Sequence, residues 1–227
     1  MLVTMALSLP LSVPVPVSFL AVALAGYLFG AIPTSFIVGK LCFHLDLRQH
    51  GSGNLGATNA FRVLGPTAGL AVALIDVAKG ALPVLAAHSL LPLPAAAGVS
   101  PQLRGWLMLI AGLAAITGHA FSPYIGFHGG KSIATSAGVM LAMVPLVFAI
   151  ELACFLAVVA VTRYVSVGSL TVAILFPVWT FSLRKPLPFS LFAIAAAVLV
   201  VWLHRANIER LRQGTEPKFS FHRGGKQ

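Results

Sequence analysis

Long apolar segments separated by short polar breaks set the hydrophobic pattern of this chain. Several approach or exceed the roughly 20 residues that a helix needs to cross a bilayer, and the alternating segments typical of a membrane β-barrel do not occur. The pattern therefore predicts an all-α integral membrane protein with about seven transmembrane helices. These predicted helices lie at about residues 18–41, 66–90, 104–120, 132–144, 146–163, 167–183 and 188–204.

Two of the breaks between the predicted helices are short. Pro145 interrupts an otherwise continuous apolar run and residues 163–166 form the next break, so six spans with one re-entrant segment is the alternative arrangement. Near the start of the chain, prolines within residues 10–16 place the first helix start near Val17. No Lys or Arg precedes Lys40, so we expect no cleavable secretory signal.

The composition agrees with a membrane protein and limits the classes of partner that we expect. Hydrophobic residues make up 58% of the 227 residues and charged residues only 9%, with a mean hydropathy of +0.95, whereas about a quarter of the residues in a soluble domain are charged. We expect a single polytopic domain over residues 1–227. The net charge is +10, but the basic residues are dispersed among apolar segments, which favours the bilayer surface and anionic substrates over nucleic acid as partners.

The basic residues also predict an orientation. An odd number of spans puts the two termini on opposite sides, and a cytoplasmic C-terminus places eleven of the fifteen Lys and Arg residues inside, in agreement with the positive-inside rule. Residues 1–17 then form an extracytoplasmic N-terminal segment and residues 205–227 a basic cytoplasmic tail. Two glycine-rich segments are expected at the cytoplasmic face.

The first glycine-rich segment covers residues 51–59, between two long apolar runs. Glycines let a backbone approach a ligand closely, and successive N–H groups or a helix N-terminus bind phosphate oxygens. The alternative is a tight interhelical loop in which Gly and Asn only form turns. The candidate phosphate ligands in this segment are Gly51, Ser52, Gly53, Asn54, Gly56, Thr58 and Asn59.

The second segment, residues 118–132, ends in Gly-Gly-Lys-Ser. This ending is similar to that of a nucleotide-binding Walker A loop, but its glycine spacing differs and no strand precedes it, so nucleotide hydrolysis is not expected. We interpret Lys131 as a fixed positive charge for a phosphate at the start of a helix, with the hydroxyl of Thr135 one turn further on.

Other polar residues have structural explanations beside functional ones. Asp76 and Lys79 lie three residues apart and form either a structural ion pair or a charge that reaches the site from beneath. His119 is an acid–base or phosphate-donor candidate, although a lone interfacial histidine more often bonds to the backbone. Residues 166–169 are either a helix N-cap or a ligand contact. Arginines that extend toward the membrane surface explain only some of the polar residues within 204–216.

With these residues the chain resembles the bacterial acyl-phosphate:glycerol-3-phosphate acyltransferase family. The resemblance implies transfer of a fatty acyl group from acyl-phosphate to the 1-hydroxyl of glycerol-3-phosphate, giving lysophosphatidic acid and inorganic phosphate in the first step of phospholipid synthesis. It also implies a seven-helix protein of the bacterial plasma (inner) membrane with a cytoplasmic site. The matching residues, in family order, are 30–35, 51–59, 76–80, 118–131, 166–169 and 204–216.

The resemblance carries over eight of the candidate site residues, which are Ser35, Arg48, Asn54, Thr58, Asn59, Lys131, Ser169 and His204. The catalytic candidates are Ser35, Ser169 and His204. The phosphate-binding candidates are Arg48, Gly51, Ser52, Gly53, Asn54, Gly56, Thr58, Asn59, His119, Gly129, Gly130, Lys131, Thr135 and Asn207. One departure is that the family commonly has Gly-Val after Gly-Gly-Lys, where this chain has Ser132 and Ile133. No cofactor is expected, the His and Cys spacings match no metal site, and a monomer is expected.

The residues favour direct attack over an acyl-enzyme. No nucleophile with a base and an orienting acid is evident, and the His-x-x-x-x-Asp pattern of coenzyme A-linked acyltransferases does not occur. Acyl-phosphate is already activated, so positioning and charge stabilisation can supply much of the rate, with a substrate phosphate accepting the proton. The competing function is a transporter or exchanger for an anionic metabolite, and a structural membrane subunit would leave the polar clusters unexplained.

Overall fold

The computed structural model describes residues 15–89 and 100–219, which form helices joined by loops and short turns. The all-α prediction is confirmed. The helices are α1 (Val15–Gly30), α2 (Thr34–Phe43), α3 (Ala57–Leu64), α4 (Pro66–Ser89), α5 (Pro101–Ala120), α6 (Ile133–Met143), α7 (Pro145–Thr162), α8 (Val165–Ser182), α9 (Leu187–Leu203) and α10 (Arg205–Arg212), and the 3-10 turns are η1 (Leu47–Gln49) and η3 (Pro123–Ile125).

Every predicted apolar segment is helical, but their lengths differ. Over the described residues, five helices are long and apolar enough to cross a membrane, or six if α9 and α10, bent by 55°, are one span. Helix α6 is shorter, with 11 residues. The count of seven spans stays a prediction.

The first predicted span is broken by a short non-helical segment. Helix α1 ends at Gly30 and α2 begins at Thr34, and the candidate span Val17–Phe43 contains both. Pro33 precedes α2, and a proline lacks the N–H that would continue the hydrogen bonding of α1. The break changes the direction of the chain near the polar residues of the candidate site described below.

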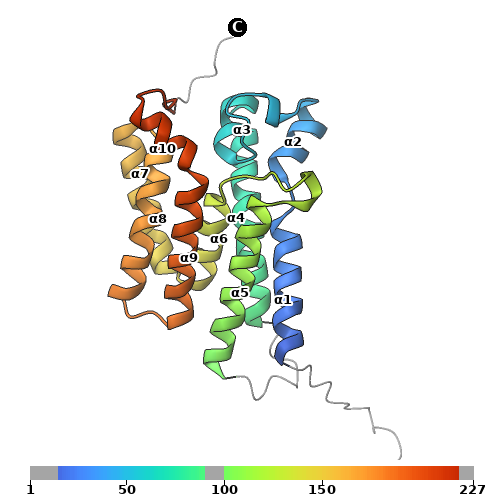
Figure 1. Cartoon of the computed structure of the whole chain (residues 1–227), viewed down its shortest axis with the longest axis vertical. Coiled ribbons are helices and arrows are strands. Elements are labelled where there is room, and N and C mark those ends of the chain that lie inside the picture. The colour runs from blue at the N-terminus through green and yellow to red at the C-terminus, as the bar shows by residue number, and fades with distance from the viewer. Residues whose placement is uncertain (1–14, 90–99, 220–227) are drawn as a thin grey trace, which may run out of the picture.

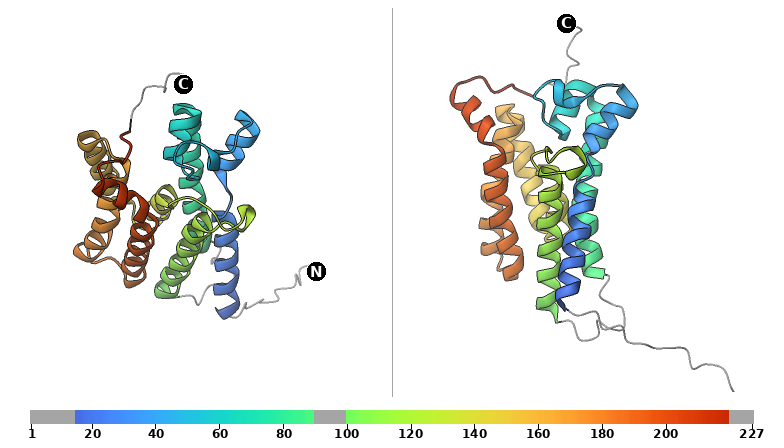
Figure 2. Two further views of the ribbon diagram at one scale, coloured as in Figure 1. Left: turned by 45° about the horizontal axis from the view of Figure 1, so that its top comes forward. Right: turned by 45° about the vertical axis from the view of Figure 1, so that its right-hand side comes forward.

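The long helices lie side by side in two groups (Figures 1 and 2). Helices α1, α4 and α5 form one group and α7, α8 and α9 the other, with α6 between them. One end of the molecule carries α2, α3, α10 and both glycine-rich segments, residues 51–59 and 118–132; we call this the loop end. Residues far apart in the sequence therefore meet there.

Glycines bring the helices of the first group and α6 into backbone contact, and we call these four helices the dense group. A Cβ on Gly80 of α4 would overlap the Thr135 carbonyl of α6, and one on Gly138 of α6 would overlap the Val77 carbonyl of α4. A Cβ on Gly118 of α5 would likewise overlap a carbonyl of α1. Small residues allow such close approach between membrane helices, so this packing explains why the first group is dense.

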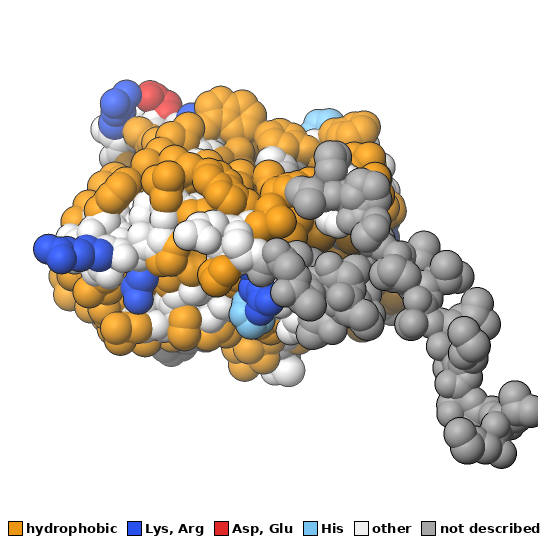
Figure 3. Space-filling model, turned by 90° about the horizontal axis from the view of Figure 1, so that it is seen from below, with side chains coloured by type: hydrophobic (Ala, Val, Ile, Leu, Met, Phe, Trp, Pro, Cys, Tyr) orange, Lys and Arg blue, Asp and Glu red, His pale blue; other side chains and the backbone are white. Residues whose placement is uncertain are grey.

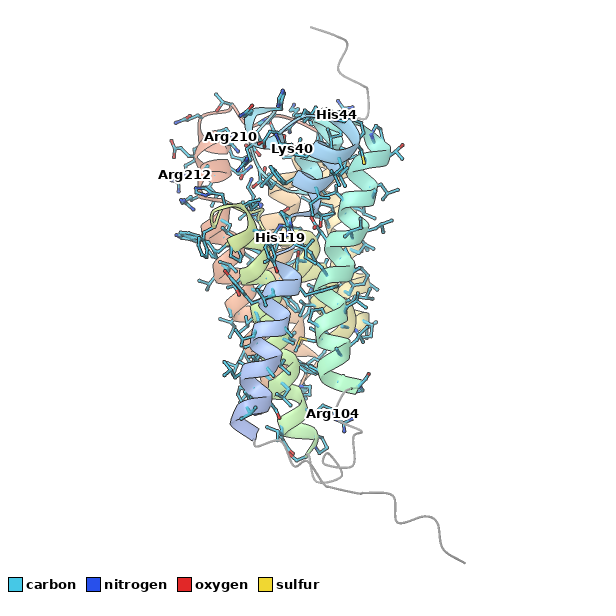
Figure 4. All side chains as sticks on the ribbon, turned by 90° about the vertical axis from the view of Figure 1, so that its right-hand side faces the viewer. Lys40, His44, Arg104, His119, Arg210 and Arg212 are labelled. Carbon is cyan, nitrogen blue, oxygen red and sulfur yellow. The ribbon has the colours of Figure 1, made fainter. Side chains whose placement is uncertain are left out.

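The charged residues are divided unequally between the two ends. Lys40, Arg210 and Arg212 lie at the loop end and Arg104 at the opposite end (Figure 4). Seen from the opposite end, the visible side chains are mostly hydrophobic (Figure 3). Two residues of the predicted basic tail, Arg223 and Lys226, lie outside the described residues.

Candidate functional site

A cavity of about 560 Å³ opens between α6, α7, α8 and α9 and extends to α3 and α10 at the loop end. Ligand cavities commonly have volumes of about 300–1,000 Å³. Its deeper wall is apolar and includes Met140, Phe148, Phe155 and Phe176. Its loop-end wall is polar, so one cavity offers both an aliphatic and an ionic environment.

Three helices begin at the polar end of the cavity. The wall includes Gly56 and Ala57 at the start of α3, Ile133 at the start of α6, and Val165 and Ser166 at the start of α8. The first N–H groups of a helix lack intrahelical acceptors, and the helix dipole places partial positive charge there. Three such ends around one cavity form an anion-binding environment.

Three basic side chains, Arg62, Lys131 and Arg210, line the same end, and we call them the cavity cations. The Lys131 ammonium donates a hydrogen bond to Asn207 Oδ1. Asn207 Nδ2 donates to Glu216 Oε1 at 2.6 Å, and Arg210 Nε donates to Glu216 Oε2 at 2.8 Å. This network joins the loop before α6 to α10 and the segment after it.

The cavity cations and Glu216 influence one another's ionisation. Burial lowers the pKa of Lys131 to about 8, and the positive charges of Arg210 and Arg62 add to the fall while Glu216 opposes it. Burial alone would raise the pKa of Glu216, but hydrogen bonds from Asn207 and Arg210 outweigh it and lower that pKa. Near neutral pH the polar end therefore has an excess of positive charge.

His204 lies where α9 meets α10 and is buried in the cavity wall. Its Nδ1 is 2.8 Å from the Val200 carbonyl oxygen. A carbonyl only accepts hydrogen bonds, so Nδ1 carries the proton and Nε2 of the neutral ring is an acceptor. His204 can therefore orient or polarise a hydroxyl group.

The first glycine-rich segment is held in shape by Asn59. Asn59 Oδ1 accepts from the Ser52 amide at 2.9 Å, and Nδ2 donates to the His50 and Leu47 carbonyls at 3.0 and 3.3 Å. Gly51 has φ +62°, and a Cβ there would overlap the Asn59 amide. The amide of Asn59 thus orders the loop, while Asn54 and Thr58 line the cavity beside it.

A buried polar cluster lies beneath the second glycine-rich segment. Lys79 Nζ is 2.8 Å from Asp76 Oδ1 and donates to the Ile32 carbonyl at 2.8 Å. His119, between the helices in Figure 4, has Nδ1 3.9 Å from Asp76 Oδ1. The expected ion pair is present, and it ties α4 to the break between α1 and α2. Asp76 and His119 also contribute to the cavity wall.

The backbone of residues 129–130 packs directly on His119. A Cβ on Gly129 would overlap the His119 carbonyl, and one on Gly130 would overlap its imidazole ring. The Gly130 amide also donates to the His119 carbonyl at 3.1 Å. These glycines let the chain cross the end of α5 and present Lys131 to the cavity.

The structure brings most of the predicted site residues together. Those in the cavity wall are Ser52, Asn54, Gly56, Thr58, Asn59, His119, Lys131, Ser169, His204 and Asn207. Those outside its wall are Ser35, Arg48, Gly51, Gly53, Gly129, Gly130 and Thr135. The Ser35 and Thr135 hydroxyls are buried and have no hydrogen-bond partner in the part of the chain that the structure describes.

Arg48 is engaged next to the cavity and not in it. Its Nη2 is 2.7 Å from Asp46 Oδ2 and its Nε is 3.0 Å from Oδ1, while the guanidinium lies 4.9 Å from the centre of the Phe36 ring. The hydrogen bonds from Arg48 hold the pKa of Asp46 well below its usual range. Arg48 is therefore paired with Asp46 and does not line the cavity.

Three residues of the polar end were not among the predicted site residues: Arg62, Arg210 and Glu216. Arg62 follows Thr58 by four residues in α3, and Arg210 follows Asn207 by three in α10, so each pair lies on one helix face. This spacing identifies the two arginines as site residues only once α3 and α10 are known to be helices.

Comparisons with known proteins agree with this architecture. A family model described as glycerol-3-phosphate acyltransferase matches residues 20–214. A glycerol-3-phosphate acyltransferase of Chlorobaculum tepidum is 42% identical over 232 aligned residues, covering 91% of this chain and 98% of the relative. Another, from Synechococcus sp. (strain JA-3-3Ab), is 45% identical over 205 residues, covering 90% and 95%.

Two crystal structures are also similar, both of PlsY, an integral membrane glycerol 3-phosphate acyltransferase. The glycerol 3-phosphate form has a TM-score of 0.80 and 34% identity, covering 89% of this chain and 96% of that one. The lysophosphatidic acid form has a TM-score of 0.77 and 33% identity, covering 90% and 96%. This chain is an integral membrane protein that belongs to the glycerol-3-phosphate acyltransferase family.

Proposed function

We propose that the protein transfers a fatty acyl group from acyl-phosphate to the 1-hydroxyl of glycerol-3-phosphate, giving lysophosphatidic acid and inorganic phosphate. The observation that carries this proposal is the two-part cavity, with helix N-termini and cations at one end and an apolar wall beyond. Both substrates carry phosphate and the donor carries an aliphatic chain. Family membership supports glycerol-3-phosphate as the acceptor.

The proposed chemistry is a direct displacement. The 1-hydroxyl oxygen of glycerol-3-phosphate attacks the acyl carbonyl carbon, the bond from that carbon to the phosphate oxygen breaks, and phosphate leaves with the electron pair. The hydroxyl proton passes to a phosphate oxygen. Because the donor is a mixed anhydride, orientation and charge stabilisation supply most of the acceleration.

The site residues divide the work in this proposal. The cavity cations and the N-terminus of α3 bind phosphate charge, with Asn54 and Thr58 orienting it. Ser169 and His204 face the reacting centre, and the acceptor Nε2 of His204 orients the attacking hydroxyl. Ser35 and Arg48 lie off the cavity wall, and their catalytic and phosphate-binding roles stay predictions.

The proposed location is the bacterial inner membrane with the loop end in the cytoplasm. The described basic side chains at the loop end, such as Lys40 and Arg212 (Figure 4), support this orientation. Glycerol-3-phosphate would then enter from the cytoplasm while the acyl chain lies among the helices.

Acyl transfer by the purified protein in detergent tests the proposal. Palmitoyl-phosphate and labelled glycerol-3-phosphate should give lysophosphatidic acid, and palmitoyl-CoA should not replace the acyl-phosphate. Added magnesium and added chelator should give the same rate. Absence of product from folded protein, together with glycerol-3-phosphate exchange in vesicles, would instead establish a transporter.

A further inference from the structure

One carboxyl group lies on the apolar wall of the cavity, far from the polar end. Glu151 of α7 is 3% exposed and lines the cavity, and both of its side-chain oxygens are buried without a hydrogen-bond partner among residues 15–89 and 100–219. The neighbouring α7 side chains on the same wall are Phe148, Leu152, Phe155 and Leu156. Their spacing of three and four residues marks one helix face, so Glu151 points the same way as these apolar residues.

Glu151 lies deeper along α7 than the reaction centre, because Phe155, one turn nearer the loop end, faces Gly168 beside Ser169. Arg163, which caps α7, lies at the loop end, where its carbonyl accepts from the Phe219 amide at 2.7 Å. Glu151 is twelve residues earlier, about 18 Å along a helix that rises about 1.5 Å per residue. That is near the middle of a hydrocarbon layer roughly 30 Å thick, where an ionisable side chain is costly and usually functional.

An unsubstituted acyl chain does not suit this position. Methylene groups packed against Glu151 would exclude water from its oxygens and leave them without partners, which is unfavourable. A hydroxyl on the chain would donate to a carboxyl oxygen whether that carboxyl is ionised or not. Sites built to hydrogen-bond a substrate hydroxyl discriminate strongly against the analogue that lacks it.

We propose that Glu151 hydrogen-bonds a hydroxyl carried part-way along the acyl chain, so that the cavity selects hydroxylated acyl donors over unsubstituted ones. This inference rests on the proposed acyl transfer, because it assigns the apolar wall to the donor. The hydroxyl position that fits lies several carbon atoms from the carbonyl, called mid-chain below, since Glu151 lies about one to two helix turns deeper than Ser169.

Donor competition with matched variants tests the inference. The ratio of kcat/KM for a mid-chain hydroxylated acyl-phosphate to kcat/KM for the unsubstituted donor of equal length should fall at least about tenfold in Glu151→Leu. Glu151→Gln, which keeps a hydrogen-bonding group, should retain most of the preference. Leu156→Met, which reshapes the same wall without changing its polarity, should alter both rates in parallel. Donors hydroxylated beside the carbonyl or at the far end should show no Glu151-dependent preference.

Binding provides a readout that does not need turnover. Non-reactive acyl-phosphonates, with and without the mid-chain hydroxyl, should raise the Tm of the detergent-solubilised protein, and the hydroxylated one should raise it more in wild type but not in Glu151→Leu. Equal ratios and equal Tm shifts in the two proteins would overturn the role of Glu151. If no donor supports transfer, the proposed function fails, and the difference in Tm shift still decides whether Glu151 recognises a hydroxyl.

Discussion

Helices α5 and α7, one from each group, bury their surfaces to very different degrees. In the candidate span Pro101–Ile125, which contains α5, 67% of the apolar window is buried within the protein, against 11% for Pro145–Thr162, which is α7. The first group together with α6 packs backbone against backbone through Gly80, Gly118 and Gly138. The second group surrounds the cavity with side chains.

This difference indicates that the first group of helices is rigid and that the second group can adapt. Backbone contacts cannot be relieved by a change of rotamer, so the first group fixes the position of the break before α2 and of the buried Asp76–Lys79 pair. Side chains such as Phe155 and Leu156 can shift, which allows the cavity wall to adapt to a chain. Site residues come from both groups, so the site lies between rigidly packed helices and side chains that can shift.

The largest expected effect is a loss of stability when the dense group is overpacked. Gly80→Ala would drive a Cβ into the Thr135 carbonyl of α6, and we expect it to lower the free energy of unfolding by about 3 kcal/mol. Gly168→Ala in α8 is the matched control, because its Cβ would meet a Val159 methyl group, which can move, at 2.7 Å. The helix-propensity gain of about 1 kcal/mol applies to both.

The Tm of the two variants in detergent measures this contrast. Gly168→Ala should lose about 1 kcal/mol or less, since a rotamer change can relieve its contact. Equal losses in the two variants would show that backbone contact does not distinguish the two groups.

The next largest effect is expected at the polar end of the cavity. Lys131→Met should lower kcat/KM for glycerol-3-phosphate by about 10-fold to 100-fold, because hydrogen bonds to charged groups contribute about 1.5–3 kcal/mol. Lys40→Met removes another loop-end lysine, one that lies 3.7 Å from Asp46 and outside the cavity, and should change the rate less than about twofold. Unchanged turnover by folded Lys131→Met would exclude a role in phosphate binding.

A pH dependence of smaller size follows from the same lysine. Burial lowers the pKa of Lys131 to about 8, so the side chain is protonated at neutral pH and loses its positive charge as pH rises through that value. The phosphate group of glycerol-3-phosphate stays dianionic in this pH range, since the second pKa of such a phosphate is about 6. We expect kcat/KM to fall by about fivefold between pH 8 and about pH 9.

Lys131→Arg is the variant that sharpens this pH test. Arginine stays protonated across this range, so the alkaline fall should disappear even if the absolute rate drops. A wild-type profile that stays flat to pH 10, or an Arg variant with the same fall as wild type, would assign the titration elsewhere.

The membrane helices were predictable because hydrophobicity adds residue by residue along a segment. The limits of α4 and α7 agree with the predicted segments to within about two residues, which is the usual uncertainty of helix ends. The short helices α3 and α10 were not predicted. Each has eight residues in a segment rich in polar residues and lacks a long apolar run, so tertiary contacts must stabilise it.

The site was predictable in its residue types but not in its pairings. Asn59 and Thr58 are neighbours in one glycine-rich segment and both line the cavity, yet the side chain of Asn59 is already engaged in hydrogen bonds that order the loop. Arg48 has the expected charge, but its partner is Asp46, two residues before it. Such choices depend on the direction of a side chain once the backbone has folded, which sequence spacing does not specify.

The smallest expected effect concerns Ser132, where the dense group meets the cavity. Ser132 has φ +58°, a left-handed conformation that costs a non-glycine residue about 1–2 kcal/mol, while its hydroxyl donates to the Ile116 carbonyl at 2.7 Å, a bond worth about 1 kcal/mol. Ser132→Gly relieves the strain but loses that bond and adds chain entropy to the unfolded state, so we expect a net change within about 1 kcal/mol. Ser132→Ala keeps the strain and loses the bond, and its Tm should therefore be the lowest of the three proteins. If Ser132→Ala were as stable as Ser132→Gly, the left-handed backbone would not be what favours glycine at this position. The hydrogen bond from the Ser132 hydroxyl to Ile116 of α5 would then have to explain why serine is present here.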